Sequence, residues 1–494
     1  LFHRAYANAS LCNPSRYNLL TGQYAGRNAA AVAPYPADQA YWLQQTTKLT
    51  GDDPCIARAM KAAGYLTGYV GKWHSNFELG TPLEWEEGTD MDDPATEQML
   101  RTRHDQHVAA IKELTGFDHV INLQVGNLDQ KAKLSAKGGS HNPEWQTQGA
   151  LEFISHAAQS GQPFFLHLAN SIPHSPDNLA ALEQDSRYTQ AGKLAAAPAC
   201  HPPRASVRKR LHAAGLNTSG PLASINAGMI VLDDQLGALR ATLEQLNLSD
   251  DTLIIWLADH SVYGKGSVFA PGLHVPMIAA WPHGLPRGAG VQQPVALVDL
   301  CRTCIAAAGG TLPAAPIDGE NLLPLMRGAH TEHAPVFAEM GWYRAVIKGR
   351  YQYVAFRPSQ EALARMEEGS VPYAVDQPAG TLRNMFGDLN APFKPAGFEA
   401  DQLYDLETDP FARTNLAHDA AHQNTLADMR RELAAYLHTF ARPFPAEPPP
   451  FMQSEHYRAL VAARMKLAQE REHYPEGHDA ERIYNLNLRD PLAS

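Results

Sequence analysis

A cysteine and an arginine lie one helical turn apart near the start of the chain, in the stretch SLCNPSRYNLLTG at positions 10–22. Pro14 suits a first helical turn, because its missing N–H would have no partner there, and Gly22 suits the end of the helix. This spacing predicts a short helix with Cys12 just ahead of its N-terminus. Free N–H groups and the helix dipole favour an anion at such a place. Arg16 comes one turn later on the same side.

A second stretch, GYLTGYVGKWH at 64–74, predicts a strand that ends in a glycine turn. Lys72 and His74 would emerge together on the following loop. Two residues apart in extended chain, they point to the same side. A fixed cation beside an imidazole suits an oxyanion substrate that also needs proton transfer. Two ordinary surface residues are the simpler alternative.

Polar residues also follow two later apolar runs. His174 follows the run at 163–168, and Asp259 and His260 follow the run at 252–257, ahead of Lys265. Active sites of parallel α/β sheets gather in the loops at the carboxyl ends of the strands. A carboxylate at such a strand end can supply hard oxygen ligands to Ca²⁺ or Mg²⁺.

Helices and strands alternate through about residue 330, which predicts an α/β fold with a mostly parallel sheet covered on both faces. The expected helices are 55–63, 145–158 and 227–246, and the expected strands are 65–70, 163–168 and 252–257. After residue 328 we expect a small separate sheet (335–340 and 343–356), an irregular stretch (358–397), a helix (423–440), a proline-rich arm (442–450) and a charged helix (455–472). The predicted domains are therefore 1–330, 331–440 and 441–494.

Composition excludes several classes of protein. The 494 residues include 41 Lys and Arg against 52 Asp and Glu, and a net charge of −11 argues against nucleic-acid binding. The longest apolar runs fall far short of the roughly 20 residues that span a bilayer. Five cysteines are too few for a disulfide framework. We interpret Cys301 and Cys304 as residues packed on a helix that ends near Gly309.

The two motifs together resemble a known family. C-x-P-S-R followed by L-x-T-G, and then G-Y-x-T-x-x-x-G-K-x-H, resemble the signatures of the type I sulfatases of the alkaline-phosphatase-like superfamily. The resemblance implies a mostly parallel sheet between helices, a smaller C-terminal α+β subdomain, and hydrolysis of a sulfate ester. The expected substrate is a sulfated carbohydrate, the commonest class for this family in bacteria. It also implies that a separate maturation enzyme oxidises Cys12 to formylglycine, an aldehyde that hydrates to a geminal diol.

The resemblance further assigns roles to the candidate residues. Arg16 would hold the diol made from Cys12, Lys72 would bind sulfate, and His74 would hold a diol hydroxyl. His174 would bind sulfate and protonate the leaving alcohol. Lys265 would bridge the sulfate and the leaving oxygen.

The metal site implied by the resemblance has Asp259, His260 and the side chain derived from Cys12 as ligands, with Ca²⁺ expected and Mg²⁺ as the alternative. Family members also open with a buried strand that ends in two metal-binding aspartates. The sequence begins at Leu1, after the point where that strand would end. The other aspartate pairs do not follow apolar strands; they are Asp52-Asp53, Asp92-Asp93, Asp233-Asp234 and Asp250-Asp251.

We therefore expect the first strand to be missing, the metal site to be incomplete, and the sheet to expose an apolar groove. A chain bounded at Leu1 would be inactive, and the full-length protein would be active. The resemblance also favours a periplasmic or secreted protein whose signal peptide would lie upstream of the given sequence.

Three points stay open at this stage. The chain could be a phosphonate or phosphate ester hydrolase of the same superfamily, or a non-catalytic relative that binds sulfate or sugar. The stretch at 269–272 departs from the family pattern after Lys265, which affects local substrate contacts. His141 could reach the substrate pocket, although a helix start capped by Asn142 with Pro143 in its first turn is favoured.

Overall fold

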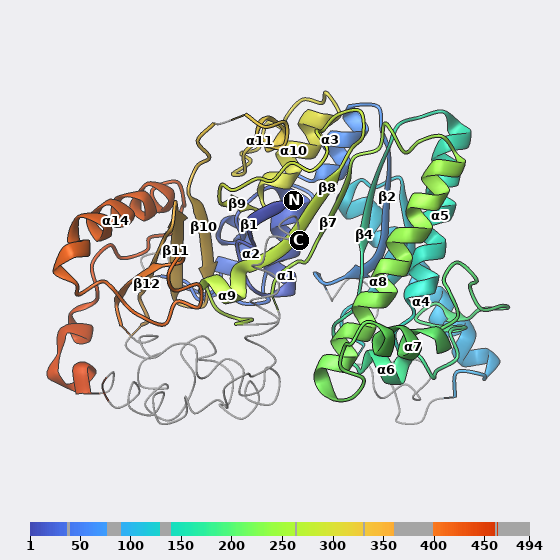
Figure 1. The fold of residues 1–494 in the computed structure, drawn as a ribbon, viewed down its shortest axis with the longest axis horizontal. Coiled ribbons are helices and arrows are strands. Elements are labelled where there is room, and N and C mark those ends of the chain that lie inside the picture. The colour runs from blue at the N-terminus through green and yellow to red at the C-terminus, as the bar shows by residue number, and fades with distance from the viewer. Residues whose placement is uncertain are drawn as a thin grey trace.

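The computed structural model describes residues 1–36, 40–76, 90–128, 140–261, 264–329, 331–359, 399–459 and 462. Over these residues the chain forms a mixed α/β structure with three main sheets, one of which, an antiparallel sheet, lies at one end of the molecule (Figure 1). This confirms the predicted fold class. No helix among the described residues is long and apolar enough to cross a membrane.

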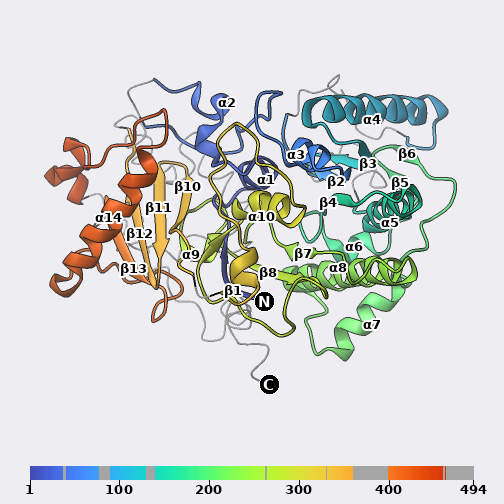
Figure 2. The ribbon, with the colours of Figure 1, turned by 90° about the horizontal axis from the view of Figure 1, so that it is seen from above.

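A parallel three-stranded sheet carries the second motif. Its order is β3-β2-β4, with β2 at Leu66–Trp73, β3 at His119–Val125 and β4 at Phe164–Ala169. Figure 2 shows these strands between α3 and α4 on one side and α5 and α8 on the other. These helices are α3 (Ile56–Ala62), α4 (Pro94–Thr115), α5 (Pro143–Ser160) and α8 (Gly220–Gln245). The predicted helices are thus confirmed, and α8 begins earlier than expected.

A second sheet, in the order β7-β8-β1-β9, is mixed rather than parallel. Its strands are β1 (Phe2–Tyr6), β7 (Ile254–Leu257), β8 (His274–Ala280) and β9 (Val295–Ala296). β8 runs antiparallel to both β7 and β1, whereas β1 and β9 are parallel. The sequence analysis did not anticipate β1. Strands β4 and β7 were expected to be buried, but most of their side chains are only half-buried.

The C-terminal part forms an antiparallel sheet, β10-β11-β12-β13. The strands are β10 (Val336–Met340), β11 (Tyr343–Lys348), β12 (Tyr351–Phe356) and β13 (Asp401–Asp405), and α14 (Gln423–Leu437) packs on them. The predicted strands and helix are confirmed, and β13 was not anticipated. One continuous apolar core joins α1, β2 and this sheet. The prediction for 358–397 lies almost wholly outside the described residues, as does most of that for 455–472.

Two helices support the start of the chain, namely α1 (Cys12–Thr21) and α10 (Asp299–Ala307), which pack against each other. α10 contains Cys301 and Cys304, both unpaired, as expected. The remaining short elements are η1 (Ala25–Arg27), α2 (Ala29–Val32), α6 (Asn178–Ala181), β5 (Tyr188–Thr189), β6 (Gly192–Lys193), α7 (Ala205–Ala213), α9 (Ala270–Leu273), α11 (Leu323–Met326), η4 (Ala420–His422) and η5 (Pro450–Gln453).

Candidate active site

Helix α1 begins at Cys12, one residue earlier than the sequence suggested, so Cys12 is its first residue. Leu11 is the N-cap and has no side-chain cap, so the helix start is held by contacts with other elements. One of these is the Ser15 hydroxyl, which donates to the backbone oxygen of Asp259. Gly22 closes the helix in the left-handed region, with φ of 67°, and its N–H bonds to the oxygen of Asn18. The predicted helix start is therefore present, with a buried cysteine at its first position.

Strand β2 does not stop at Gly71, as the sequence analysis expected, but continues to Trp73. Gly71 has φ of +95° and lies at an irregularity in the pairing of β2 with β3. A Cβ atom there would lie 2.2 Å from the carbonyl oxygen of Ala169 in β4. Only glycine fits this close approach, which leaves Lys72 inside the strand and His74 directly after it.

Cys12, Asp259 and His260 form one cluster of ligand atoms that all lie within 4.8 Å of one another. The Sγ atom of Cys12 is 3.2 Å from Nε2 of His260. The Nδ1 of His260 is 2.8 Å from the carbonyl oxygen of Ser261, to which it can only donate, so Nε2 faces the cysteine. Arg16 forms a 3.0 Å ion pair with Asp259. Among the described residues this is the one cluster of three or more candidate metal ligands.

The electrostatics of this cluster favour its charged forms. Burial alone would raise the pKa of the Asp259 carboxyl, but Arg16 and His260 hold it far below its usual range. Burial would also raise the pKa of the Cys12 thiol, yet His260 and Lys265 bring it well below its usual value. Burial opposes the charge on His260, but Asp259 and Cys12 raise its pKa.

Lys72 is almost fully buried and donates a 2.6 Å hydrogen bond to Oδ1 of Asn127. Burial, with the charge of Arg16 adding to it and Cys12 opposing it, lowers the pKa of Lys72 to about 8. Burial also lowers the pKa of His74, and the positive charge of Lys72 adds to this shift. The contact of the His74 ring with Cys12 opposes it. A cation with so little exposure to water attracts an anion strongly.

His174 lies on the loop after β4, as predicted. Burial and the positive charges of Lys72 and Lys265 together lower the pKa of its imidazole to about 4, because like charges repel the added proton. Its Nδ1 lies 3.0 Å from the backbone oxygen of Ser175. Lys265 is 8% exposed, and its loop is tied to the α1 entry by the Gly266 N–H, which bonds to the oxygen of Ser10.

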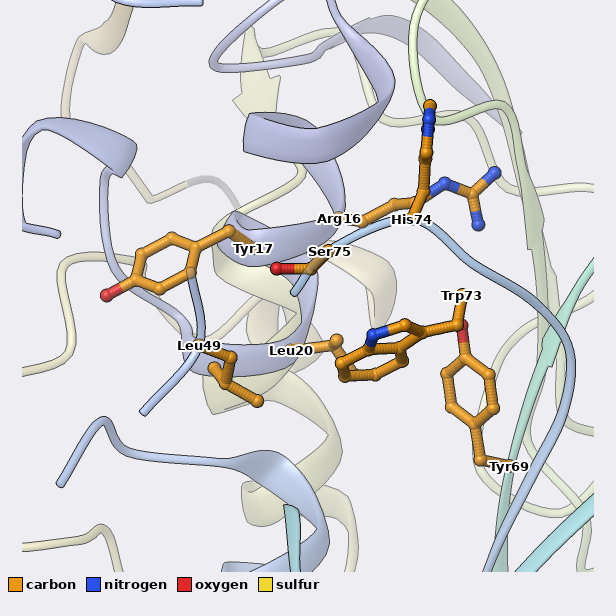
Figure 3. Close-up of a pocket in the computed structure, with 8 residues that line it drawn as sticks. All are labelled: Arg16, Tyr17, Leu20, Leu49, Tyr69, Trp73, His74 and Ser75. Carbon is orange, nitrogen blue, oxygen red and sulfur yellow. The ribbon is translucent and has the colours of Figure 1, made fainter. Parts of the chain in front are cut away.

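Figure 3 shows the underside of the site. Arg16 and His74 extend toward the same side, above a small cavity whose lower wall includes Leu20, Leu49 and Trp73.

The structure therefore brings together the motif residues that sequence reasoning selected, namely Cys12, Arg16, Lys72, His74, His174, Asp259, His260 and Lys265. Sequence reasoning missed Asn127, which directly holds Lys72. Its place just after β3, at the carboxyl end of a parallel strand, is the signal that could have identified it.

The aspartate pairs are engaged elsewhere. Asp53 accepts from Tyr17, Asp93 caps α4, Asp234 pairs with Arg210, and Asp251 pairs with His283. His141, the open case, uses its ring for contacts with the loop that carries His174. Its ring nitrogens contact Ser171, His174 and Pro176, and Asn142 caps α5 as favoured.

The fold and this cluster define a class of α/β protein in which a buried nucleophile position, cations and an imidazole surround a site for an oxyanion. The sulfatase family model matches residues 1–310. N-acetylgalactosamine-6-sulfatase of Canis lupus familiaris is 26% identical over 380 residues, which are 71% of this chain and 64% of the relative. The chain thus spans 64% of the length of this curated relative. The chain belongs to the sulfatase family.

Solved structures share the fold. BT4656 in complex with its substrate D-glucosamine-2-N,6-O-disulfate matches with a TM-score of 0.55 and 15% identity, covering 91% of this chain and 92% of that chain. The phosphonate monoester hydrolase SpPMH from Silicibacter pomeroyi matches with a TM-score of 0.53 and 20% identity, covering 89% and 88%. At these identities the likeness establishes the fold alone.

Proposed function

We propose that the protein hydrolyses a sulfate ester, with the side chain derived from Cys12 as the nucleophile. The observation that supports this most directly is the meeting of Cys12 with Lys72, Lys265 and His174, which come from four separate segments of the chain. The three basic residues match the negative charge on a sulfate ester and the proton that a leaving alcohol requires.

Membership of the sulfatase family implies formylglycine and a divalent metal. Hydrated formylglycine supplies a diol whose second hydroxyl allows the bound sulfate to be released, and the metal supplies positive charge at the sulfate oxygens. Asp259, His260 and the position-12 side chain would hold the metal. A carboxylate oxygen suits a hard cation, so we expect Ca²⁺, with Mg²⁺ as the alternative.

Each polar residue of the site has its own role in this reaction. Arg16 holds Asp259 in its charged form and lies beside the position-12 side chain. Lys72 and Lys265 neutralise sulfate oxygens as charge builds up on them. His174 carries a proton to the leaving oxygen, because the negative charge of the bound ester offsets the burial that otherwise keeps the imidazole neutral. His74 would accept a proton at the position-12 side chain once that residue carries formylglycine.

A sulfated carbohydrate is the substrate class that we favour. The canine relative is named for an N-acetylgalactosamine 6-sulfate, and BT4656 was solved with a disulfated glucosamine. Hydrolysis of a phosphonate or phosphate ester is the second candidate, because a phosphonate monoester hydrolase shares the fold. A non-catalytic sulfate-binding role is disfavoured, because the predicted catalytic residues are all present.

The test uses the full-length gene product co-expressed with a formylglycine-generating enzyme, the partner that the motif requires. Mass spectrometry of the peptide around Cys12 should show the aldehyde. The purified protein should then release sulfate from 4-nitrophenyl sulfate faster than it hydrolyses a phosphate diester with the same leaving group. The Cys12→Ala variant is the control. An unmodified thiol, or activity that persists in Cys12→Ala, would contradict the proposal.

Secretion or export to the periplasm follows from the same proposal. A tagged full-length protein should appear outside the cytoplasm with its N-terminus shortened. Retention of the intact N-terminus in the cytoplasmic fraction would contradict this location.

A further inference from the structure

We propose that His141 is the positioning residue for the proton donor His174; this rests on the function proposed above. His141 lies just before α5 and is 3% exposed. Its Nε2 is 2.8 Å from the backbone oxygen of His174 and 3.0 Å from that of Pro176. Two carbonyl oxygens can only accept, so Nε2 carries the proton and donates to both.

The other ring nitrogen of His141 also contacts the loop that carries His174. Nδ1 of His141 is 3.2 Å from the hydroxyl of Ser171, which can donate to it. One imidazole therefore touches the loop at residues 171, 174 and 176, on both sides of the His174 side chain. The loop also folds on itself, because the N–H of His174 bonds to the oxygen of Ser171.

Arg204 holds the backbone of His141 in place. Arg204 donates to the backbone oxygen of His141 at 3.4 Å, and its guanidinium makes two 2.6 Å hydrogen bonds to the Glu144 carboxylate. Asn178 anchors the opposite side of the loop through a 3.1 Å bond to the oxygen of Pro173. The donor loop is thus clamped between α5 and the segment around residue 178.

The geometry separates this role from a catalytic one. Both ring nitrogens of His141 are occupied by loop atoms, so the ring is not available to a substrate. Burial lowers the pKa of His141 to about 4, which keeps the ring neutral at working pH. Removing His141 would leave two carbonyls without their donor and free the backbone that carries His174. When the general acid is misplaced, the rate falls most for substrates with a poor leaving group, because such groups need the proton most.

The experiment measures how rate depends on the leaving group, with substituted phenyl sulfates from 4-nitrophenyl sulfate to phenyl sulfate. The His174→Gln variant defines the loss of the acid, and it should lose activity mainly on phenyl sulfate. We expect His141→Leu to lower kcat on phenyl sulfate at least about tenfold more than on 4-nitrophenyl sulfate. His141→Gln keeps an N–H donor near the Nε2 position and should retain more of the phenyl sulfate activity.

The matched control is His201→Leu. His201 contacts α5 through the Thr147 hydroxyl at 2.7 Å and makes no hydrogen bond to the loop at 171–176 among the described residues. This variant should therefore lower the activity on both substrates equally or not at all. Equal losses in His141→Leu, like those of His201→Leu, would overturn the positioning role while the proposed function stands. A His174→Gln variant without leaving-group dependence would instead overturn the proposed proton donor. If His141→Leu does not fold, His141→Phe, which keeps a ring of similar shape but has no N–H donor, supplies the same comparison.

Discussion

At the scale of single residues, the pairing of Lys72 with Asn127 shows how the site keeps a cation in a buried place. The ammonium has lost most of its hydration, and the amide oxygen at 2.6 Å replaces part of it. A neutral acceptor does this without cancelling the positive charge, which stays available for an anionic ester. An acidic residue at the same place would bind the ammonium more tightly and compete with the substrate.

This reasoning gives a prediction for Asn127. Asn127→Ala should lower kcat/KM roughly tenfold, the size expected for a lost hydrogen bond to a charged group. Asn127→Asp should lower it further, because the carboxylate neutralises Lys72. Steady-state kinetics on 4-nitrophenyl sulfate checks both. Gln124→Ala is the control, since Gln124 is equally buried in β3 and bonds to the oxygen of Gly126 instead. Equal losses in the Gln124 and Asn127 variants would contradict this role.

His141 also links the site to pH. Its pKa is about 4 in the folded protein and near 6.5 in the unfolded chain. Between these values the unfolded chain binds the proton and the folded protein does not, so stability is lost as pH falls from about 6.5 to 4. The loss from this group is at most about 3 kcal/mol. In urea unfolding at several pH values, the free energy of unfolding should fall less steeply with falling pH in His141→Gln than in the wild type. An equal pH dependence in both would contradict the role given to His141.

At the scale of elements, β2 depends on one glycine to deliver Lys72. Gly71→Ala would place a methyl group against the Ala169 carbonyl and strain a backbone at φ of +95°. Gly64→Ala is the matched control, because Gly64 has φ of +87° with no atom within 4 Å of the added carbon. We expect Gly64→Ala to cost about 1–2 kcal/mol of unfolding free energy, and Gly71→Ala to cost clearly more and to reduce activity. If chemical denaturation shows equal losses of unfolding free energy in the two variants, the close contact between position 71 and the Ala169 carbonyl does not decide the requirement for glycine.

The elements also show where sequence reasoning reached its limit. Periodicity and turn residues predicted α1, α5, β4 and β7, because each is a local pattern. They did not predict that β2 passes through Gly71, since the cause is a contact with Ala169 from a distant strand. They missed β1 for a similar reason: its short sequence is stabilised by pairing with β8 and β9. The motif residues were predicted from their family pattern, whereas Asn127 belongs to no motif, and its place at the carboxyl end of β3 does not by itself predict a contact with Lys72.

At the scale of the whole molecule, the site lies where two sheets approach each other. β4 ends one sheet and β7 ends the other, and Figures 1 and 2 both place these strands next to each other. Their apolar side chains are only half-buried, and each has one edge without a strand partner among the described residues. Unpaired strand edges with apolar side chains are unfavourable in water. The family resemblance implies an apolar strand ending in two aspartates, and a strand between β4 and β7 would bring such aspartates to Asp259.

This arrangement predicts the effect of joining the family's aspartate-ending strand to residues 1–494. The extended protein should bind Ca²⁺ at least about tenfold more tightly in calorimetry, because a site with more carboxylate ligands has higher affinity. Its β4 and β7 amides should also exchange more slowly with deuterium, because a paired edge is protected. The amides of β2, already paired on both sides by β3 and β4, are the internal reference and should change little. If β4 and β7 exchange at the same rate in both proteins, the edges are not joined by an added strand, and the metal site would have to be completed elsewhere.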